Sequence, residues 1–270
     1  MMMQRVSPAH IEWLAGRLTN RDWQIVEGVN ALRLLTGQHI ERLFFVGVAP
    51  GRSRVASRSR ALHRLVAWRV LVPLPRRIGG AGRGSTTLAF ALDSAGQRLM
   101  RARLLETGQL PRVRRPGPPT ERTVRHILAV SEAYVALSES AREHGFTLAS
   151  FQAEPASWWP NGLSHGYIKP DAFAMLTLGK VRDHWWLELD LATESLPAVK
   201  RQLEAYLDFW NRGQLGPGKV MPRVVVAATT PERQRAIARL AEQFRSAPPE
   251  LFRIVQIHEL ADALYQVLLE

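Results

Sequence analysis

Three acidic residues in the second half of the chain have types and positions that could support metal-dependent chemistry: Asp171, Glu188 and Asp190. They lie in two apolar segments separated by Gly179–Arg182, a pattern that predicts a β-hairpin. With these four residues as the loop, Asp171 lies opposite Asp190 and Phe173 lies opposite Glu188. Because side chains alternate between the faces of a strand, the three carboxylates then share one face of the hairpin.

The opposite face of this hairpin collects a row of apolar residues, which favours this register because a slip of one residue would move every side chain of one strand to the other face. The row consists of Ala172, Ala174, Leu176, Leu178, Trp185, Leu187, Leu189 and Leu191. Clustered carboxylates repel one another unless a proton or a cation lies between them, and Mg²⁺ and Mn²⁺ prefer oxygen ligands. The pattern indicates a Mg²⁺ or Mn²⁺ site held by Asp171, Glu188 and Asp190. Acids on the solvent face of an ordinary surface hairpin are the alternative.

Charge is unevenly distributed along the chain. Residues 1–120 contain 20 arginines, no lysine and 6 acidic residues, a formal charge of +14. Residues 121–270 contain 16 basic and 18 acidic residues, a formal charge of −2. A positive excess confined to one half is typical of a module that binds a polyanion, and we expect the polyanion to be double-stranded DNA.

Composition excludes several classes of site. The chain has no cysteine, so disulfides and cysteine-based zinc sites are excluded, and no zinc is expected. It has no run of the roughly 18 apolar residues that a membrane span needs. Its start, Met1–Arg5, has no apolar core like that of a signal peptide. We therefore expect a cytoplasmic protein without membrane association, and the repeated methionine leaves the true start codon open.

The basic half has the pattern of helices followed by a small hairpin. Helices are predicted at about 20–36, 38–45 and 53–68, and β-like runs at 69–74 and 86–92. This order resembles a winged helix-turn-helix domain, in which the third helix enters the major groove and the wing contacts the backbone or the minor groove. The candidate DNA-binding residues lie on the third helix and in the wing: Arg52, Arg54, Arg58, Arg60, Arg64, Arg76, Arg77 and Arg83. An arginine-rich, solvated helix face is the alternative.

The glycine-rich wing could be mistaken for a phosphate-binding loop, but it lacks the Lys-Ser/Thr ending and precedes a strand, so no nucleotide is expected. A helix at 94–106 closes the basic module, and residues 107–120, rich in proline and arginine, are typical of a linker. The predicted organisation is a winged-helix DNA-binding domain at 1–106, a basic linker at 107–120 and a second domain at 121–270. The fold class is α/β plus α+β, and the apolar strand Arg223–Ala228 is expected near the centre of the second sheet.

Two motifs of the second domain resemble those of the PD-(D/E)xK nuclease-like superfamily. Lys169–Phe173 holds Pro-Asp at the start of one strand, and Leu187–Ser195 holds Glu-x-Asp on the next. With Lys200 and Tyr206 on the following helix, and with a winged helix before them, the whole chain looks like the replication-relaxation family of plasmids and other mobile elements. The resemblance implies a mixed central sheet flanked by helices and Mg²⁺- or Mn²⁺-dependent hydrolysis of phosphodiesters.

The resemblance also implies roles for the acidic residues. Asp171 and Glu188 correspond to the metal-binding carboxylates, whereas Asp190 stands where the superfamily has a lysine. Lys200 is then the candidate for the missing positive charge. The implied catalytic residues are Asp171, Glu188, Asp190 and Lys200, and an exposed helix charge is the alternative for Lys200.

Further residues near these motifs are candidates for DNA or outer-shell contacts. Gln202 and Tyr206 resemble the Gln-x-x-x-Tyr of RecB-type nucleases, and helix packing is their alternative role. Glu194 is either an outer-shell ligand or an acid favoured by a helix N-terminus. Trp158 and Trp159 either stack on bases or lie in the core under the hairpin, and their size favours the core.

Three functions follow from these patterns. The leading one is a DNA-binding protein of a plasmid or mobile element whose second domain is a metal-dependent endonuclease or nickase. The second is a non-catalytic DNA-binding replication or mobilisation factor with a degenerate nuclease fold. The third is a protein-interaction adaptor. The sequence leaves open the cognate DNA, the strand preference, and whether the chain forms a homodimer or binds replication or mobilisation proteins.

Overall fold

The structure is a computed structural model that describes residues 6–74, 88–106, 108, 120–163 and 166–270. It divides into two compact units, Met1–Ser131 and Glu132–Glu270, and the division falls inside the long helix α6 (Glu121–His144). The predicted wing arginines Arg76, Arg77 and Arg83, and residues 107 and 109–119 of the predicted linker, lie outside the described residues. The linker and the domain boundaries built on it therefore stay predictions.

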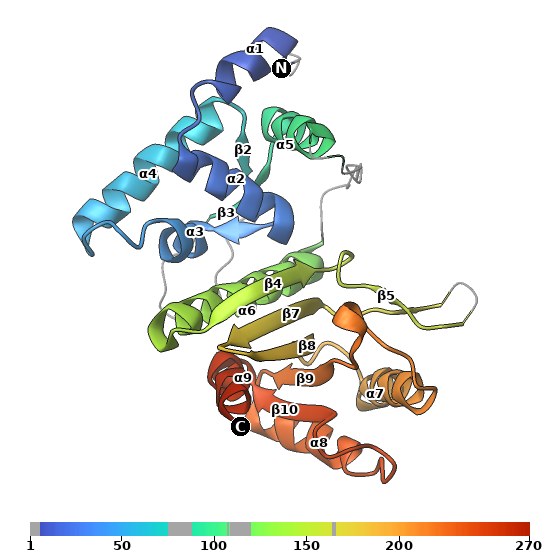
Figure 1. The fold of residues 1–270 in the computed structure, drawn as a ribbon. Helices are drawn as coiled ribbons and strands as arrows, with labels where there is room; N and C mark the ends of the chain where they lie inside the picture. Colours follow the sequence, from blue (N-terminus) through green and yellow to red (C-terminus); the bar gives the residue numbers. More distant parts are fainter. Residues whose placement is uncertain (1–5, 75–87, 107, 109–119, 164–165) are drawn as a thin grey trace. The chain divides into compact units, whose positions relative to one another are not determined.

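The first unit combines helices with a small antiparallel sheet (Figure 1). Its elements before α6 are α1 (Pro8–Ala15), α2 (Asn20–Leu32), β1 (Leu35–Thr36), α3 (Gly37–Phe44), α4 (Arg52–Ala67), β2 (Leu71–Pro73), β3 (Ala89–Leu92) and α5 (Ser94–Glu106). Strand β3 lies between β1 and β2 and pairs with both. The predicted helices that correspond to α3, α4 and α5 are confirmed within a residue or so at each end.

The first long helix ends earlier than the sequence indicated. Apolar periodicity extended it to Gly37, but α2 ends at Leu32 because Arg33 adopts a left-handed backbone with φ of 69°. The chain then forms the short strand β1. The hydroxyl of Thr36 accepts a hydrogen bond from the His39 backbone N–H at 3.1 Å and begins α3.

Helix α2 is tied to α4 through a buried acid. The Thr19 hydroxyl accepts from the Asp22 backbone N–H at 3.2 Å, and the Asp22 carboxylate accepts from the Thr19 backbone N–H at 3.0 Å, which makes a capping box. The same carboxylate accepts two hydrogen bonds from Arg64 Nη2, at 2.7 and 2.9 Å, and is 1% exposed. Arg64 therefore fixes the packing of two helices.

The second unit is a three-layer α/β structure. After α6 its elements are β4 (Thr147–Ala153), β5 (Trp159–Pro160), β6 (Tyr167–Ile168), β7 (Ala172–Leu178), β8 (Val181–Asp190), α7 (Leu196–Asn211), the 3-10 turn η1 (Pro217–Lys219), β9 (Arg223–Ala228), α8 (Pro231–Ala241), β10 (Phe252–Gln256), the 3-10 turn η2 (Ile257–Glu259) and α9 (Leu260–Leu269). The predicted mixed central sheet flanked by helices is confirmed, and β9 has the predicted bounds.

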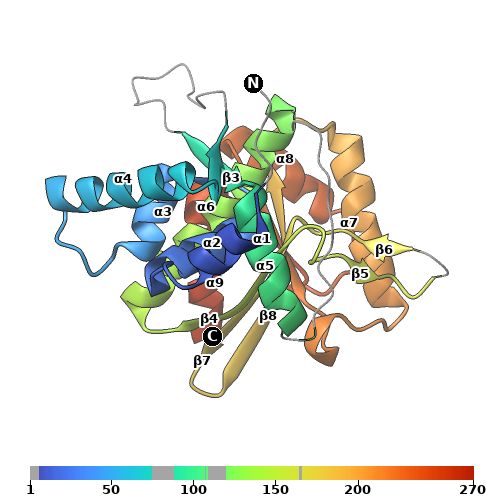
Figure 2. The same ribbon diagram turned by 90° about the horizontal axis from the view of Figure 1, so that it is seen from above.

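Strand β8 is the middle strand of a five-stranded sheet with the order β10-β9-β8-β7-β4. It pairs antiparallel with β7 and parallel with β9. Helices α7 and α8 cover one face, where their apolar side chains form one core cluster with Phe173, Trp186 and Val226. Helix α9 and the last part of α6 cover the other face (Figure 2). Within the described ranges, none of the helices is apolar over enough length to cross a bilayer.

Gly96 in α5 shows how closely the first unit is packed. A Cβ atom at this position would lie 2.3 Å from the carbonyl oxygen of Val70 and 3.2 Å from a methyl carbon of Leu92. A backbone carbonyl cannot move aside as the end of a flexible side chain can. Only glycine therefore allows α5 to approach the residue before β2 this closely.

We predict that Gly96→Ala destabilises the first unit by about 1–3 kcal/mol, the usual cost of overpacking a buried site. The matched control is Gly47→Ala, because a Cβ at Gly47 meets nothing within 4 Å. Thermal unfolding of the two variants checks this, and equal melting temperatures would contradict the packing described.

Candidate functional site

The β7–β8 hairpin has a shorter turn than the sequence indicated. The predicted four-residue loop is wrong: Leu178 pairs with Val181, so the turn consists of Gly179 and Lys180. Gly179 has a φ of 58°, and a two-residue turn is a common link between antiparallel strands. The register differs from the predicted one by two residues, so each side chain keeps its predicted face.

The corrected register brings Asp171 and Glu188 together. Ala172 pairs with Leu187, and one further step places Asp171 opposite Glu188 instead of Asp190. The Asp171 carboxylate accepts a hydrogen bond from the Leu189 backbone N–H at 2.7 Å. The two predicted metal-binding carboxylates are thus neighbours on adjacent strands.

Glu188 is buried, which the sequence did not predict. This face of the hairpin is covered by α7, and Glu188 is 4% exposed. Its Oε1 accepts a hydrogen bond from the Tyr206 hydroxyl, and its carboxylate also accepts one from the Gln202 side chain. The alternative of acids on a solvent face is therefore wrong for Glu188.

The surroundings of Glu188 favour its neutral form. Burial, followed by the negative charge of Asp171, raises the pKa of Glu188 well above its ordinary value of 4.5, and Glu194 adds a smaller effect in the same direction. The hydrogen bonds from Tyr206 and Gln202 act in the opposite direction. Burial and the negative charge of Glu188 also raise the pKa of Tyr206 well above 10.0. These shifts favour a proton on the pair, and a cation could take the place of that proton.

Asp190 takes no part in this pair, and an arginine that the sequence analysis missed explains why. Arg233 Nε on α8 lies 2.7 Å from Asp190 Oδ2, and both side chains are largely buried. Arg233 Nη2 also donates to the Glu194 carbonyl at 2.7 Å. The Ala192 backbone N–H donates to Asp190 Oδ1 at 2.6 Å. Asp190 and Arg233 therefore fix the connection from β8 to α7.

Lys200 lies on a different side of α7 from Gln202 and Tyr206. Residues four apart share a helix face, whereas residues two apart are separated by roughly 200°. Lys200 is 41% exposed, and its Nζ lies 4.0 Å from Glu204 Oε1, an i,i+4 pair on the helix surface. The structure thus places Gln202 and Tyr206 against Glu188 and gives Lys200 a surface partner.

The donor chemistry of the pair suits a hard divalent cation, since two adjacent carboxylates supply the oxygens that Mg²⁺ and Mn²⁺ prefer. No third acidic or histidine side chain completes such a group among the described residues. A cation would be held by Asp171 and Glu188, with water or substrate oxygens in its other positions. The predicted third ligand, Asp190, is instead engaged by Arg233.

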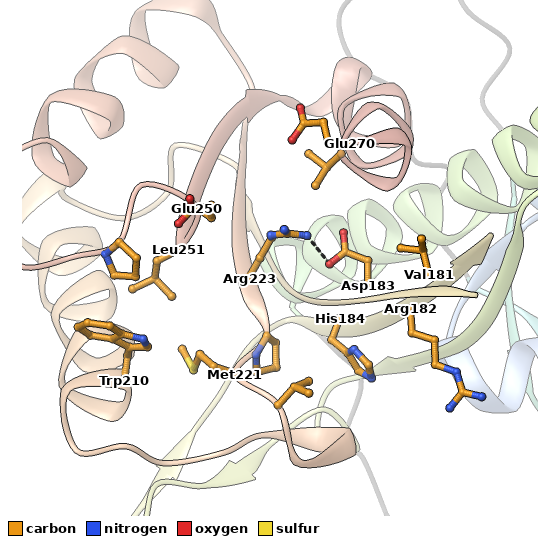
Figure 3. Close-up of a pocket in the computed structure, with 14 residues that line it drawn as sticks. Val181, Arg182, Asp183, His184, Trp210, Met221, Arg223, Glu250, Leu251 and Glu270 are labelled. Atoms are coloured by element: carbon orange, nitrogen blue, oxygen red, sulfur yellow. Dashed lines mark hydrogen bonds and ion pairs between the residues drawn. The ribbon is translucent and has the colours of Figure 1, made fainter. Parts of the chain in front are cut away.

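A cavity of about 420 Å³ lies at the beginning of β8, away from this pair (Figure 3). Its lining includes Trp210 and an ion pair between Arg223 Nη1 and Asp183 Oδ1 at 2.5 Å. Burial lowers the pKa of His184, which lines the same cavity. None of the predicted site residues lines it. The cavity and the carboxylate pair are separate features of the second unit.

The predicted DNA-binding arginines of α4 fall into two groups. Arg54, Arg58 and Arg64 are engaged within the unit: Arg54 donates to the Val48 carbonyl at 2.8 and 3.0 Å, and Arg58 Nη1 lies 2.7 Å from Glu41 Oε2. Arg52 and Arg60 are exposed. Arg52 and Arg60 are thus the α4 arginines most available to a ligand.

The two tryptophans before the pair are neither fully buried nor fully exposed. The Trp159 indole N–H donates to the Leu215 carbonyl at 3.0 Å, and its ring packs partly against the core under α7. Lys169 Nζ lies over the Trp158 ring, 5.0 Å from its centroid. The predicted preference for the core is met in part by Trp159.

A model of the replication-relaxation family matches residues 27–224, which is more than half of the chain. The chain belongs to the replication-relaxation family. The match spans most of the first unit and continues through β8 and α7 of this replication-relaxation protein. Neither the curated proteins nor the solved structures gave a match.

We predict that Glu188→Gln changes how the stability of this replication-relaxation protein depends on pH. Because the pKa of Glu188 is raised in the folded state, its contribution to stability is complete below the ordinary value of 4.5 and is lost as pH rises through the folded-state pKa. Glutamine keeps an acceptor for Tyr206 but cannot ionise. As pH rises, the free energy of unfolding of the variant should therefore exceed that of the wild type, by about 1.4 kcal/mol for each unit by which the pKa of Glu188 is raised.

Urea unfolding at a series of pH values measures this difference. The matched control is Glu250→Gln, which changes an exposed glutamate of the same unit and should follow the wild type. Parallel curves for the wild type and Glu188→Gln above the ordinary value of 4.5 would contradict a raised pKa of the buried Glu188.

Proposed function

We propose that this protein binds DNA during the replication or relaxation of a plasmid or other mobile element, with a winged helix in its first unit that docks on duplex DNA. The observation that carries the proposal is the order helix, strand, helix, helix, strand, strand from α2 to β3, with the late strand β3 between β1 and β2. In winged helices the helix before the last two strands enters the major groove. Here that helix is the arginine-rich α4.

The start of α4 supports a contact with phosphate. Its N-cap, Gly51, provides no side-chain hydrogen bond, and no acid lies in the first turn. The free backbone N–H groups and the positive end of the helix dipole favour an anion there. Arg52 adds an exposed positive charge at the same place, and Arg60 adds another about two turns later. Duplex DNA supplies phosphates along both positions.

We predict that Arg52→Gln and Arg60→Gln each weaken duplex binding and reduce the slope of log affinity against log salt by about 1, the effect of losing one phosphate contact. Arg101→Gln is the matched control, because it removes the same charge from an exposed position on α5. Fluorescence anisotropy over a salt series checks this. An equal effect of all three changes would contradict a specific contact of α4 with DNA and would indicate general attraction to a positively charged surface.

Metal-dependent nicking is a second candidate, favoured by the adjacency of Asp171 and Glu188 in a PD-(D/E)xK-like sheet. A buried carboxyl group beside a second acid costs stability, and acids with pKa values perturbed in this way concentrate at functional sites. When bound there, Mg²⁺ or Mn²⁺ would polarise a phosphate and lower the pKa of a bound water. Tyr206 and Gln202 would hold the Glu188 carboxylate in place.

Among the residues that the structure describes, neither the superfamily's lysine position nor Lys200 places a positive charge beside the two carboxylates. Asp190 stands at the lysine position, its partner Arg233 is bound on both sides, and Lys200 lies next to Glu204. DNA binding therefore stands as the first proposal, and nicking is tested separately.

Incubation with supercoiled plasmid and Mg²⁺ or Mn²⁺ distinguishes the two. If the pair is catalytic, wild type nicks the plasmid, Asp171→Asn and Glu188→Gln do not, and the surface change Glu204→Gln has no effect. If wild type shifts duplex DNA in a gel but leaves plasmid intact with either metal, the nicking candidate is wrong and the binding proposal stands.

A further inference from the structure

A small two-stranded ribbon stands beside the carboxylate pair and has no part in the main sheet. It consists of β5 and β6, with Trp159 paired to Ile168 and Pro160 paired to Tyr167. The ribbon is anchored at its base. Ile168 is buried in the core under α7, and the Trp159 indole N–H donates to the Leu215 carbonyl at 3.0 Å.

One face of β6 is turned to solvent. Exposure alternates along the strand and the two residues after it: Tyr167 is exposed, Ile168 buried, Lys169 exposed and Pro170 buried. This alternation places Tyr167 and Lys169 on the same outward face, separated by roughly 7 Å, the length of two extended residues. Tyr167 is 53% exposed, so much of its aromatic ring is open to solvent.

The ribbon leads directly into the carboxylate pair, because Asp171 follows Lys169 by two residues. Hydrogen bonds to the backbone carbonyls of Pro170 and Asp171 fix the segment between β6 and β7. The Ser157 hydroxyl donates to the Pro170 carbonyl at 2.6 Å, and the Glu154 backbone N–H donates to the Asp171 carbonyl at 2.9 Å. The Asp171 side chain is bound in turn to the Leu189 backbone. The outward face of β6 is therefore fixed relative to Asp171 and Glu188.

An exposed aromatic ring next to an exposed ammonium matches one nucleotide, since the ring stacks on a base and the ammonium pairs with a phosphate. In a duplex the bases are already stacked on one another, so a ring on a surface ribbon has no base face to meet. Lys169 is also held over Trp158, at 5.0 Å from the ring centroid, which restricts its side chain. The exposed ring favours a strand whose bases are unpaired, and the restrained ammonium of Lys169 favours a phosphate beside it.

We propose that the outward face of β6, formed by Tyr167 and Lys169, binds single-stranded DNA next to the carboxylate pair. This inference rests on the proposed DNA-binding function and specifies the form of DNA that the second unit holds. The first unit then binds duplex, while the ribbon holds an unpaired segment, such as a replication or relaxation origin exposes when it melts.

The test is the affinity of the full chain for a fluorescein-labelled single-stranded oligothymidylate and for a duplex of mixed sequence, at low salt. Tyr167→Ala should weaken single-strand binding about tenfold and leave duplex binding unchanged. Tyr167→Phe keeps the ring and should keep the affinity. Lys169→Gln should lower the salt dependence of single-strand binding, whereas Lys180→Gln, an exposed lysine in the β7–β8 turn, should not.

The possible results distinguish failure of this inference from failure of the DNA-binding proposal on which it rests. If the wild type binds duplex, and Tyr167→Ala binds the single strand as tightly as the wild type does, the inference is wrong and the duplex-binding proposal stands. If the wild type binds neither single-stranded nor duplex DNA, both the inference and the DNA-binding proposal are wrong. If Tyr167→Ala changes the oligomeric state in light scattering and not the single-strand affinity, the ribbon is a protein interface and the inference is overturned.

Discussion

Glu188 occupies the middle strand of the main sheet, with a helix packed over its carboxyl group. A carboxylate in such a place loses its hydration, and it stays only if it is protonated or bound by donors. Tyr206 and Gln202 supply those donors from α7, and Asp171 adds a second negative charge at the next strand. The face of α7 that carries Gln202 and Tyr206 meets this requirement. The same requirement makes the pair a place where a cation would be stabilised.

The connection after β8 has its own constraint. Asp190 and Arg233 join β8 to α8, and Arg233 also holds the Glu194 carbonyl. A largely buried ion pair of this kind is costly to break from one side only. It fixes where α7 begins, and so it indirectly positions Gln202 and Tyr206. In this protein of the replication-relaxation family, Asp190 is thus part of the framework that positions α7.

Much of this was accessible from the sequence, because apolar runs and turn residues mark the strands and helices of the second unit clearly. Alternation also assigned Asp171 and Glu188 to the correct face. It could not choose between registers two residues apart, because such a shift leaves every side chain on its own face. Burial of Glu188 depends on where α7 packs, and Arg233 lies 43 residues from Asp190, so no local pattern reveals either. In the first unit, the termination of α2 at Arg33 is a backbone event that periodicity does not show.

The protonation state of Glu188 is the most direct test of the account, since the hydrogen bonds of α7 and the cation-binding potential of the pair both depend on it. Its side-chain carboxyl ¹³C resonance, assigned by its absence in the Glu188→Gln protein, can be followed by NMR as pH is changed in metal-free buffer. A midpoint well above the ordinary 4.5 is the predicted result. A midpoint at or below that value would mean that the carboxylate is solvated or paired with a positive charge, and would contradict the arrangement described.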